Sequence, residues 1–178
     1  MPSYLVTGGS GQLGQCFHTI AKESPVINLF FTSRIEVDIT RSETLANFYS
    51  KNPFDGIINC AAYTNVDQAE KEKESAFKIN TVGLQNLIDF AEIKNLSIIH
   101  FSSDYVFDGQ ATEPYPDEAV ANPKGIYGNS KLQGEVRLSK SRCKNVTIRT
   151  SWLFSPFGKN FVKSIARLAK EKLALEVV

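Results

Sequence analysis

Short apolar runs alternate with longer segments of helical periodicity along nearly the whole chain. The runs that we expect to form strands span 3–7, 26–32, 55–61, 97–103, 145–151 and 173–178. The helical segments between them span 11–23, 42–52, 74–95, 125–141 and 160–172. Strands that are apolar along their length are typical of a sheet covered on both faces. The alternation therefore predicts an α/β fold, a doubly wound parallel sheet with helices on both faces.

The size and charge of the chain limit the kinds of protein it can be. Its 178 residues suit one domain, spanning 1–178, and its net charge of +1 gives no electrostatic reason to bind nucleic acid or a membrane surface. The three cysteines are far apart in sequence, which fits a reducing cytoplasm and no metal cluster. No apolar run approaches the ~20 residues of a membrane span, and we expect no signal peptide. Because the chain stops in an expected strand, we also expect that a C-terminal portion is missing.

Three glycines mark the junction between the first strand and the first helix. Gly8, Gly11 and Gly14 stand in "VTGGSGQLGQ", three residues apart. Glycine permits positive φ, close approach of the backbone to a pyrophosphate, and close packing of the helix. The free N–H groups at the helix start favour an anion. The motif therefore predicts a dinucleotide site rather than a plain tight turn.

Residues after the second strand should lie beside the adenosine ribose of such a dinucleotide. Ser33 and Arg34 are suited to a 2′-phosphate, so we expect NADPH, with NADH also possible; a solvated Arg34 is the alternative. Asp38 and Ile39 are expected beside the adenine. After the third strand, the small pair Ala61 and Ala62 would let the backbone pass close to the cofactor.

The segment "YGNSK" places Tyr127 and Lys131 four residues apart, on one face of an expected helix. An ammonium beside a phenol lowers the tyrosine pKa, which would tune a proton donor toward neutral pH. By itself the spacing is common, and an exposed pair on a surface helix is the simpler interpretation.

Several longer segments make the chain resemble a known family. "TGGSGQLG", "NCAAYTNVDQAE", "FSSDYVFDG", "PYPDEAVANPKGIYGNSKLQGE" and "RTSWLF" are similar to the extended short-chain dehydrogenases/reductases, and more narrowly to the dTDP-4-dehydrorhamnose reductases. The resemblance runs from Ser3 to about Ile165 and implies a Rossmann-like fold. It also implies a catalytic triad of Ser103, Tyr127 and Lys131, with neighbouring Ser102 as the alternative hydroxyl.

The same resemblance implies further contacts. It adds Gln12, Leu13, Tyr63 and Asn80 to the cofactor site, with Asn80 holding Lys131 through water. It implies a sugar pocket lined by Thr64, Val66, Asp104, Tyr105 and Trp152; core packing is the alternative for Trp152. Some relatives hold magnesium at a dimer contact through an acidic residue after the glycine motif. This chain has Gln15 there, so we expect no metal, and a homodimer is left open.

The implied reaction is reduction of the C4 ketone of dTDP-4-dehydro-L-rhamnose by NADPH, which gives dTDP-L-rhamnose for cell-surface polysaccharide. Family members continue past this chain with a smaller portion that closes over the sugar nucleotide, so this chain alone is expected to turn over little. Two alternatives stay open. One is an epimerase or dehydratase of nucleotide sugars, and the other is a regulatory subunit resembling the β subunit of methionine adenosyltransferase.

Overall fold

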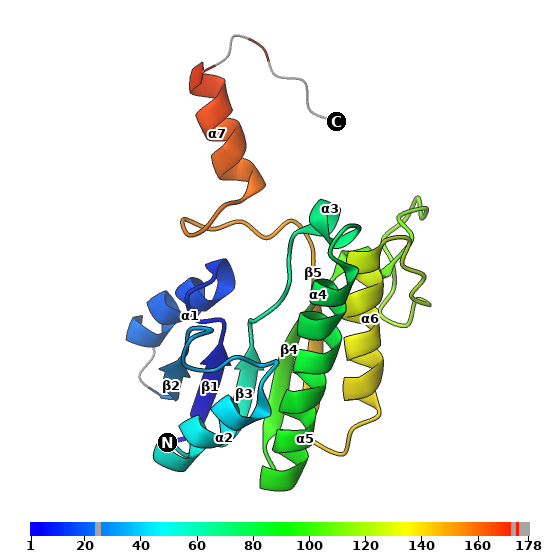
Figure 1. The fold of residues 1–178 in the computed structure, drawn as a ribbon. Helices are drawn as coiled ribbons and strands as arrows, with labels where there is room; N and C mark the ends of the chain where they lie inside the picture. Colours follow the sequence, from blue (N-terminus) through cyan, green and yellow to red (C-terminus); the bar gives the residue numbers. More distant parts are fainter. Residues whose placement is uncertain (24–25, 172–173, 175–178) are drawn as a thin grey trace.

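Five parallel strands form the centre of the molecule (Figure 1). The computed structural model describes residues 1–23, 26–171 and 174. The strands are β1 (Ser3–Thr7), β2 (Asn28–Phe31), β3 (Gly56–Asn59), β4 (Ser97–Ser103) and β5 (Asn145–Thr150). They lie in the order β2-β1-β3-β4-β5. The predicted parallel sheet is confirmed, and the predicted strand at 173–178 lies almost wholly outside the described residues.

Helices connect the strands as the alternation predicted. They are α1 (Gln12–Glu23), α2 (Ser42–Lys51), α3 (Val66–Ala69), α4 (Lys73–Phe77), α5 (Leu84–Lys94), α6 (Ile126–Ser139) and α7 (Phe161–Glu171). The short helix α3 and the 3₁₀ turn η2 (Asp104–Val106) were not predicted. No helix among the described residues is long and apolar enough to cross a membrane.

The two faces of the sheet carry different helices. On β2, the Phe31 ring stacks on His18 of α1 with centroids 3.5 Å apart, whereas the Phe30 ring meets Phe48 of α2. Neighbouring strand residues point to opposite faces, so α1 and α2 lie on opposite sides. Figure 1 shows α5 and α6 over the same face as α2. The main core lies there, between the sheet and α2, α5 and α6, and includes Leu5, Leu45, Ile57, Leu84, Leu87, Ile98 and Leu138.

The segment 74–95 differs from the single regular helix that the sequence predicted. Between α4 and α5 it forms a π-helical segment, η1 (Lys78–Gly83). Two successive polar residues of η1 face α6: Asn80 Nδ2 donates to Ser130 Oγ at 2.9 Å, and Thr81 Oγ1 donates to the Ser130 carbonyl at 2.8 Å. The wider π-helical turn lets both side chains reach α6, an arrangement that a regular α-helical turn does not favour for successive residues.

The strand order creates a crevice at one end of the sheet. From β1 the chain crosses to β2 on one side and then returns to β3 on the other. Loops therefore diverge at the carboxyl ends of β1 and β3, where open α/β sheets bind ligands. In Figure 1, α7 stands above this edge, after the segment that follows β5. None of the residues of α7 is buried.

Candidate active site

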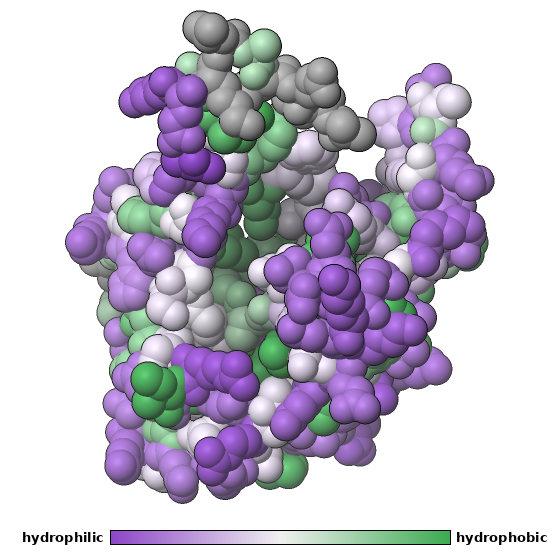
Figure 2. All heavy atoms as spheres, turned by 45° about the horizontal axis from the view of Figure 1, so that its top comes forward, coloured by the Kyte–Doolittle hydropathy of each residue, from purple (hydrophilic) through white to green (hydrophobic). Residues whose placement is uncertain are grey.

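A cavity of about 610 Å³ opens at the carboxyl ends of β1, β3 and β4. Its walls come from the loop after β1, the segments after β2 and β3, the end of β4, helix α6 and the segment after β5. Figure 2 brings this end of the molecule forward and shows a hollow between hydrophilic rims. The cavity thus lies at the position that the strand order favours for a ligand.

The glycine loop lines the cavity. Gly8 has φ of +66°, and a Cβ there would lie 2.8 Å from the Ala61 backbone nitrogen. A Cβ on Gly14 would lie 2.5 Å from the Gly8 carbonyl oxygen. Only glycine therefore fits at both positions: the loop packs against the segment directly after β3, and α1 packs against the loop, without side chains between them. This leaves room for a pyrophosphate beside the backbone.

Most residues predicted for the cofactor line this cavity. Those from the three connecting segments are Gly8, Gly11, Gln12, Leu13, Arg34, Asp38, Ile39, Ala61 and Ala62. The predicted adenine, ribose and pyrophosphate contacts are thereby brought together from elements far apart in sequence. Whether each contacts a nucleotide stays a prediction.

Four predicted cofactor residues lie elsewhere. Gly14 packs beneath the loop, and Ser33 lines a neighbouring hollow. The Tyr63 hydroxyl donates to Glu72, away from the cavity. Asn80 is buried and exchanges hydrogen bonds with the Tyr63 backbone, accepting from its N–H at 2.8 Å and donating to its carbonyl at 3.1 Å.

Whether Asn80 holds Lys131 through water stays a prediction. Its amide is already committed to Tyr63 and to Ser130 on α6. These bonds fasten the segment after β3 to α6, so Asn80 shapes the cavity wall without lining it.

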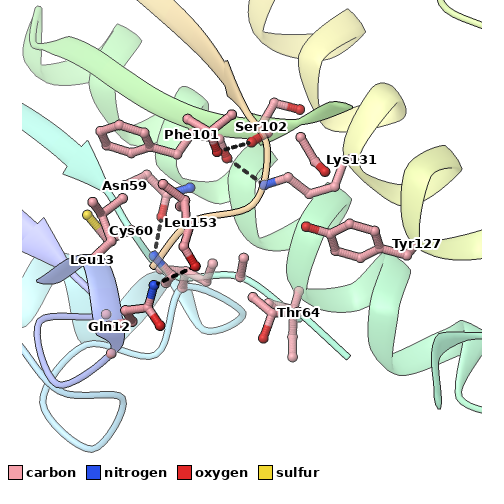
Figure 3. Close-up of a pocket in the computed structure, with 18 of the residues that line it drawn as sticks. Gln12, Leu13, Asn59, Cys60, Thr64, Phe101, Ser102, Tyr127, Lys131 and Leu153 are labelled. Carbon is pink, nitrogen blue, oxygen red and sulfur yellow. Dashed lines mark hydrogen bonds between the residues drawn. The ribbon is translucent and has the colours of Figure 1, made fainter. Parts of the chain in front are cut away.

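Tyr127 and Lys131 both point into the cavity from α6 (Figure 3). Lys131 is only 2% exposed, and its Nζ donates to the Phe101 carbonyl at 2.6 Å. Burial lowers the pKa of Lys131 to about 8, while the Glu135 carboxylate acts in the opposite direction. An exposed surface pair is thus excluded for these two side chains.

The pKa of Tyr127 moves opposite to the sequence-based prediction. Burial raises it, the neighbouring Ser103 hydroxyl lowers it, and Asp104 and Tyr105 raise it further. Lys131 is not among the causes, because its ammonium is directed at the Phe101 carbonyl. Tyr127 is therefore kept protonated by desolvation, a state from which it can donate.

The two candidate hydroxyls at the end of β4 differ in their surroundings. Ser103 Oγ donates to Asp104 Oδ1 at 3.0 Å and accepts from the Tyr105 N–H at 3.2 Å. Ser102 Oγ is buried without a hydrogen-bond partner in the part of the chain that the structure describes. Both residues line the cavity, and the Ser103 hydroxyl is the one that acts on Tyr127.

The five residues predicted for the sugar also line the cavity: Thr64, Val66, Asp104, Tyr105 and Trp152. The Tyr105 ring meets the Tyr127 ring edge to face, with centroids 5.6 Å apart. Trp152 is 74% exposed and has φ of +50°, so it does not pack into a core of the described residues. Its ring instead meets Phe161 of α7 at 5.1 Å.

Sequence reasoning missed part of the cavity wall. The unpredicted lining residues include Ser10, Asn59, Cys60, Phe101, Leu153 and Lys159. The strand-end positions of Asn59, Cys60 and Phe101 were a usable signal, because side chains there meet at one sheet edge. No sequence signal pointed to Leu153. It lies at the cavity because Gln12 Nε2 donates a hydrogen bond to its carbonyl at 3.1 Å. Among the described residues, no cluster of His, Cys, Asp and Glu could hold a metal ion.

The strand order, the glycine loop at the crevice and the Tyr127–Lys131 pair define a nucleotide-binding domain of the short-chain dehydrogenase/reductase type. A family model described as the RmlD substrate binding domain matches residues 3–178. The chain belongs to this family.

Named relatives agree with this assignment. The chain is 39% identical over 178 residues to a dTDP-4-dehydrorhamnose reductase of Aggregatibacter actinomycetemcomitans, covering all of this chain and 60% of that protein. It matches the crystal structure of the Bacillus anthracis dTDP-4-dehydrorhamnose reductase in complex with NADP with a TM-score of 0.91 and 35% identity, covering 97% of this chain and 61% of that one. The crystal structure of the Clostridium acetobutylicum dTDP-4-dehydrorhamnose reductase matches with a TM-score of 0.89 and 36% identity, covering 95% of this chain and 60% of that one. The chain thus spans about three fifths of these relatives.

Proposed function

We propose that the protein reduces the C4 ketone of dTDP-4-dehydro-L-rhamnose with NADPH, giving dTDP-L-rhamnose. One observation carries the proposal: the protonated Tyr127 hydroxyl, the Lys131 ammonium and the glycine loop share one cavity of about 610 Å³. The named relatives supply the substrate, and the NADP complex of the Bacillus anthracis enzyme supplies the cofactor.

The residues fit NADPH because the loop after β1 presents its backbone to the cavity at Gly8 and Gly11, where no side chain stands in the way of a pyrophosphate. Gln12 and Ala62 line the same cavity. The bound reduced nicotinamide would supply hydride to the carbonyl carbon of the sugar. Lys131 would hold the adjoining ribose hydroxyls from α6, and Arg34 would lie toward the 2′-phosphate.

Tyr127 would act as the general acid. As the carbonyl carbon gains hydride, negative charge develops on its oxygen, and the phenol hydroxyl donates its proton there. Ser103 would add a hydrogen bond that strengthens as this charge grows. A positive charge on Lys131 would favour the same charge development. Asp104, Tyr105 and Trp152 would position the sugar.

The chain would form the cofactor-binding portion, residues 1–178, and the remaining length of the relatives would complete the nucleotide-sugar pocket. We expect the reaction in the cytoplasm. A homodimer stays a prediction.

The test is NADPH oxidation by the complete protein with dTDP-4-dehydrorhamnose. Tyr127→Phe should lower kcat by at least about 100-fold, the usual scale for a general acid. Tyr115→Phe is the matched control, because Tyr115 lies outside this cavity and its hydroxyl donates to Asp108 at 2.8 Å. An unchanged rate for Tyr127→Phe would remove it from this role.

The same preparation separates the alternatives. An epimerase or dehydratase would retain NAD through purification and consume no NADPH stoichiometrically. A regulatory subunit would copurify with its partner enzyme and reduce no ketosugar.

A further inference from the structure

The first turn of α6 carries Tyr127, yet its own N-cap residue provides no side chain to hold it. That residue is Gly125, and Tyr127 is the second residue of the helix. A helix leaves its first N–H groups without partners inside the helix, and a serine, threonine, aspartate or asparagine at the N-cap usually satisfies one of them. Without such a partner the first turn would fray, and the Tyr127 hydroxyl would not be fixed in the cavity.

A carboxylate from a distant segment caps this helix instead. Glu70 Oε1 accepts a hydrogen bond from the Ile126 N–H at 2.7 Å, across 56 positions of the chain. A Cβ on Gly125 would lie 3.0 Å from the same oxygen, so a larger N-cap residue would crowd the carboxylate. Negative charge is favoured at a helix N-terminus, and an ionised acceptor strengthens the hydrogen bond. Glu70 thus supplies the cap that Gly125 lacks.

Glu70 reaches α6 from a segment that is anchored on its own. It follows α3 directly, and Figure 1 shows α3 beside the first turn of α6. The Asn65 side chain caps α3, and Ala69 is fully buried. Further back, the Asn80 amide exchanges hydrogen bonds with the Tyr63 backbone. The position of Glu70 is therefore set independently of α6.

The contact joins two walls of the cavity. The segment that carries Glu70 lines the cavity through Thr64 and Val66, and α6 lines it through Tyr127. Lys131 lies one turn further along α6, where it is buried and its Nζ donates to a carbonyl of β4. Loss of the cap would therefore displace Tyr127 and leave Lys131 in place.

We propose that Glu70 is a positioning residue, which caps α6 and thereby holds the Tyr127 hydroxyl at the ketone of the bound substrate. The inference rests on the proposed function, in which Tyr127 donates the proton. Glu70 is not among the groups that shift the pKa of Tyr127. It acts through the position of the helix end rather than through its charge.

The test compares Glu70→Ala with Glu70→Gln in the complete protein. Glutamine keeps an oxygen that can accept from the Ile126 N–H, whereas alanine removes the acceptor. Glu70→Ala should lower kcat for the ketosugar about tenfold, because a small displacement of a catalytic group is costly. Its dissociation constant for NADPH should change by less than about twofold, since Lys131 and the glycine loop stay in place. Glu70→Gln should keep kcat within about twofold of wild type.

A second measurement follows the position of Tyr127 without turnover. In protein labelled with 3-fluorotyrosine, the fluorine NMR signal of Tyr127 is the one that is lost in Tyr127→Phe. With NADPH bound, this signal should shift or broaden in Glu70→Ala and stay in place in Glu70→Gln. Glu74→Ala is the matched control, because Glu74 is exposed in the first turn of α4. It should change neither kcat nor the signal. Glu70 is itself exposed, so we expect every variant to fold.

Three results would overturn the role of Glu70: an unchanged Tyr127 signal in Glu70→Ala, a displaced signal without a loss of kcat, or equal losses in Glu70→Ala and Glu70→Gln. The last would mean that the charge matters and the cap does not. A protein whose signal shifts as expected but that reduces no ketosugar would overturn the proposed reaction and leave the placement of Tyr127 by Glu70 standing. Reduction of the ketosugar without the shift would do the reverse.

Discussion

The burial of Lys131 has a measurable consequence for stability. Its side chain is 2% exposed, and burial lowers its pKa from 10.5 to about 8. The unfolded chain takes the ordinary value, so between about pH 8 and 10.5 the unfolded state binds more protons than the folded state. The free energy of unfolding therefore increases as pH rises through that window, because the buried lysine loses its charge. Below about pH 8 the buried lysine is charged, and its full desolvation cost lowers the free energy of unfolding.

The size of the effect follows from the two pKa values. They differ by about 2.5 units, and each unit corresponds to about 1.4 kcal/mol, so the buried charge costs about 3 kcal/mol at pH 7. At pH 10 most of the lysine in the folded state is neutral, and the cost falls to about 1 kcal/mol. Lys131→Met has similar length and no proton to exchange. Its stability relative to wild type should therefore fall by about 2 kcal/mol between pH 7 and pH 10.

The assay is urea unfolding followed by circular dichroism, at several pH values for both proteins. Comparing the two cancels other groups, such as Cys60, whose pKa is raised to about 12 by burial and which destabilises the fold as pH rises above its ordinary value. Lys140→Met, at the exposed end of α6, is the control and should show a constant difference. If the difference in unfolding free energy between Lys131→Met and wild type did not vary with pH, the Lys131 ammonium would not be desolvated as described.

Two further substitutions test the frame around the site. Gly14→Ala would place a Cβ 2.5 Å from the Gly8 carbonyl oxygen and the Gly9 Cα, so α1 must move; we expect a loss of about 2 kcal/mol in unfolding free energy and weaker NADPH binding, and unchanged values would contradict the close packing. Glu135→Gln removes the buried carboxylate that accepts hydrogen bonds from Arg149 Nε at 3.1 and 3.2 Å and from Arg149 Nη2 at 2.6 Å. Urea unfolding should show a loss of about 3 kcal/mol in unfolding free energy. The double variant Glu135→Gln, Arg149→Gln should lose less stability than the two single variants added together.

The order of strands and helices was predictable because apolar runs and helical periodicity report burial directly. β1 and β4 have the predicted bounds, and the other described strands differ by one or two residues at an end. The glycine loop was predictable for a related reason: a strand, three glycines and a helix in succession leave few other conformations. Local sequence therefore sufficed wherever local physics decides the conformation.

Contacts that depend on where an amide or ammonium finds its partner were not predictable. Asn80 faces Tyr63 and Ser130 because the π-helical segment turns it toward α6, and helical periodicity cannot indicate such an inserted residue. Lys131 reaches the Phe101 carbonyl, 30 positions earlier in the chain, rather than Tyr127. Both contacts depend on tertiary packing, which a spacing of four residues cannot predict.

The correction at Tyr127 changes how the proposed donor works. A tyrosine with a lowered pKa would lose part of its protons near neutral pH, whereas burial raises the pKa of Tyr127 and keeps the phenol intact. The same burial lowers the pKa of Lys131 to about 8, so its charge persists at neutral pH but is held at a cost. Negative charge that develops on a carbonyl oxygen in this cavity would offset that cost, because it gives the ammonium a counter-charge inside the same desolvated space. In the proposed reaction Lys131 would act on the reacting oxygen and not on the resting phenol, so the desolvated cavity, rather than the spacing of the pair, would make the two side chains a catalytic unit.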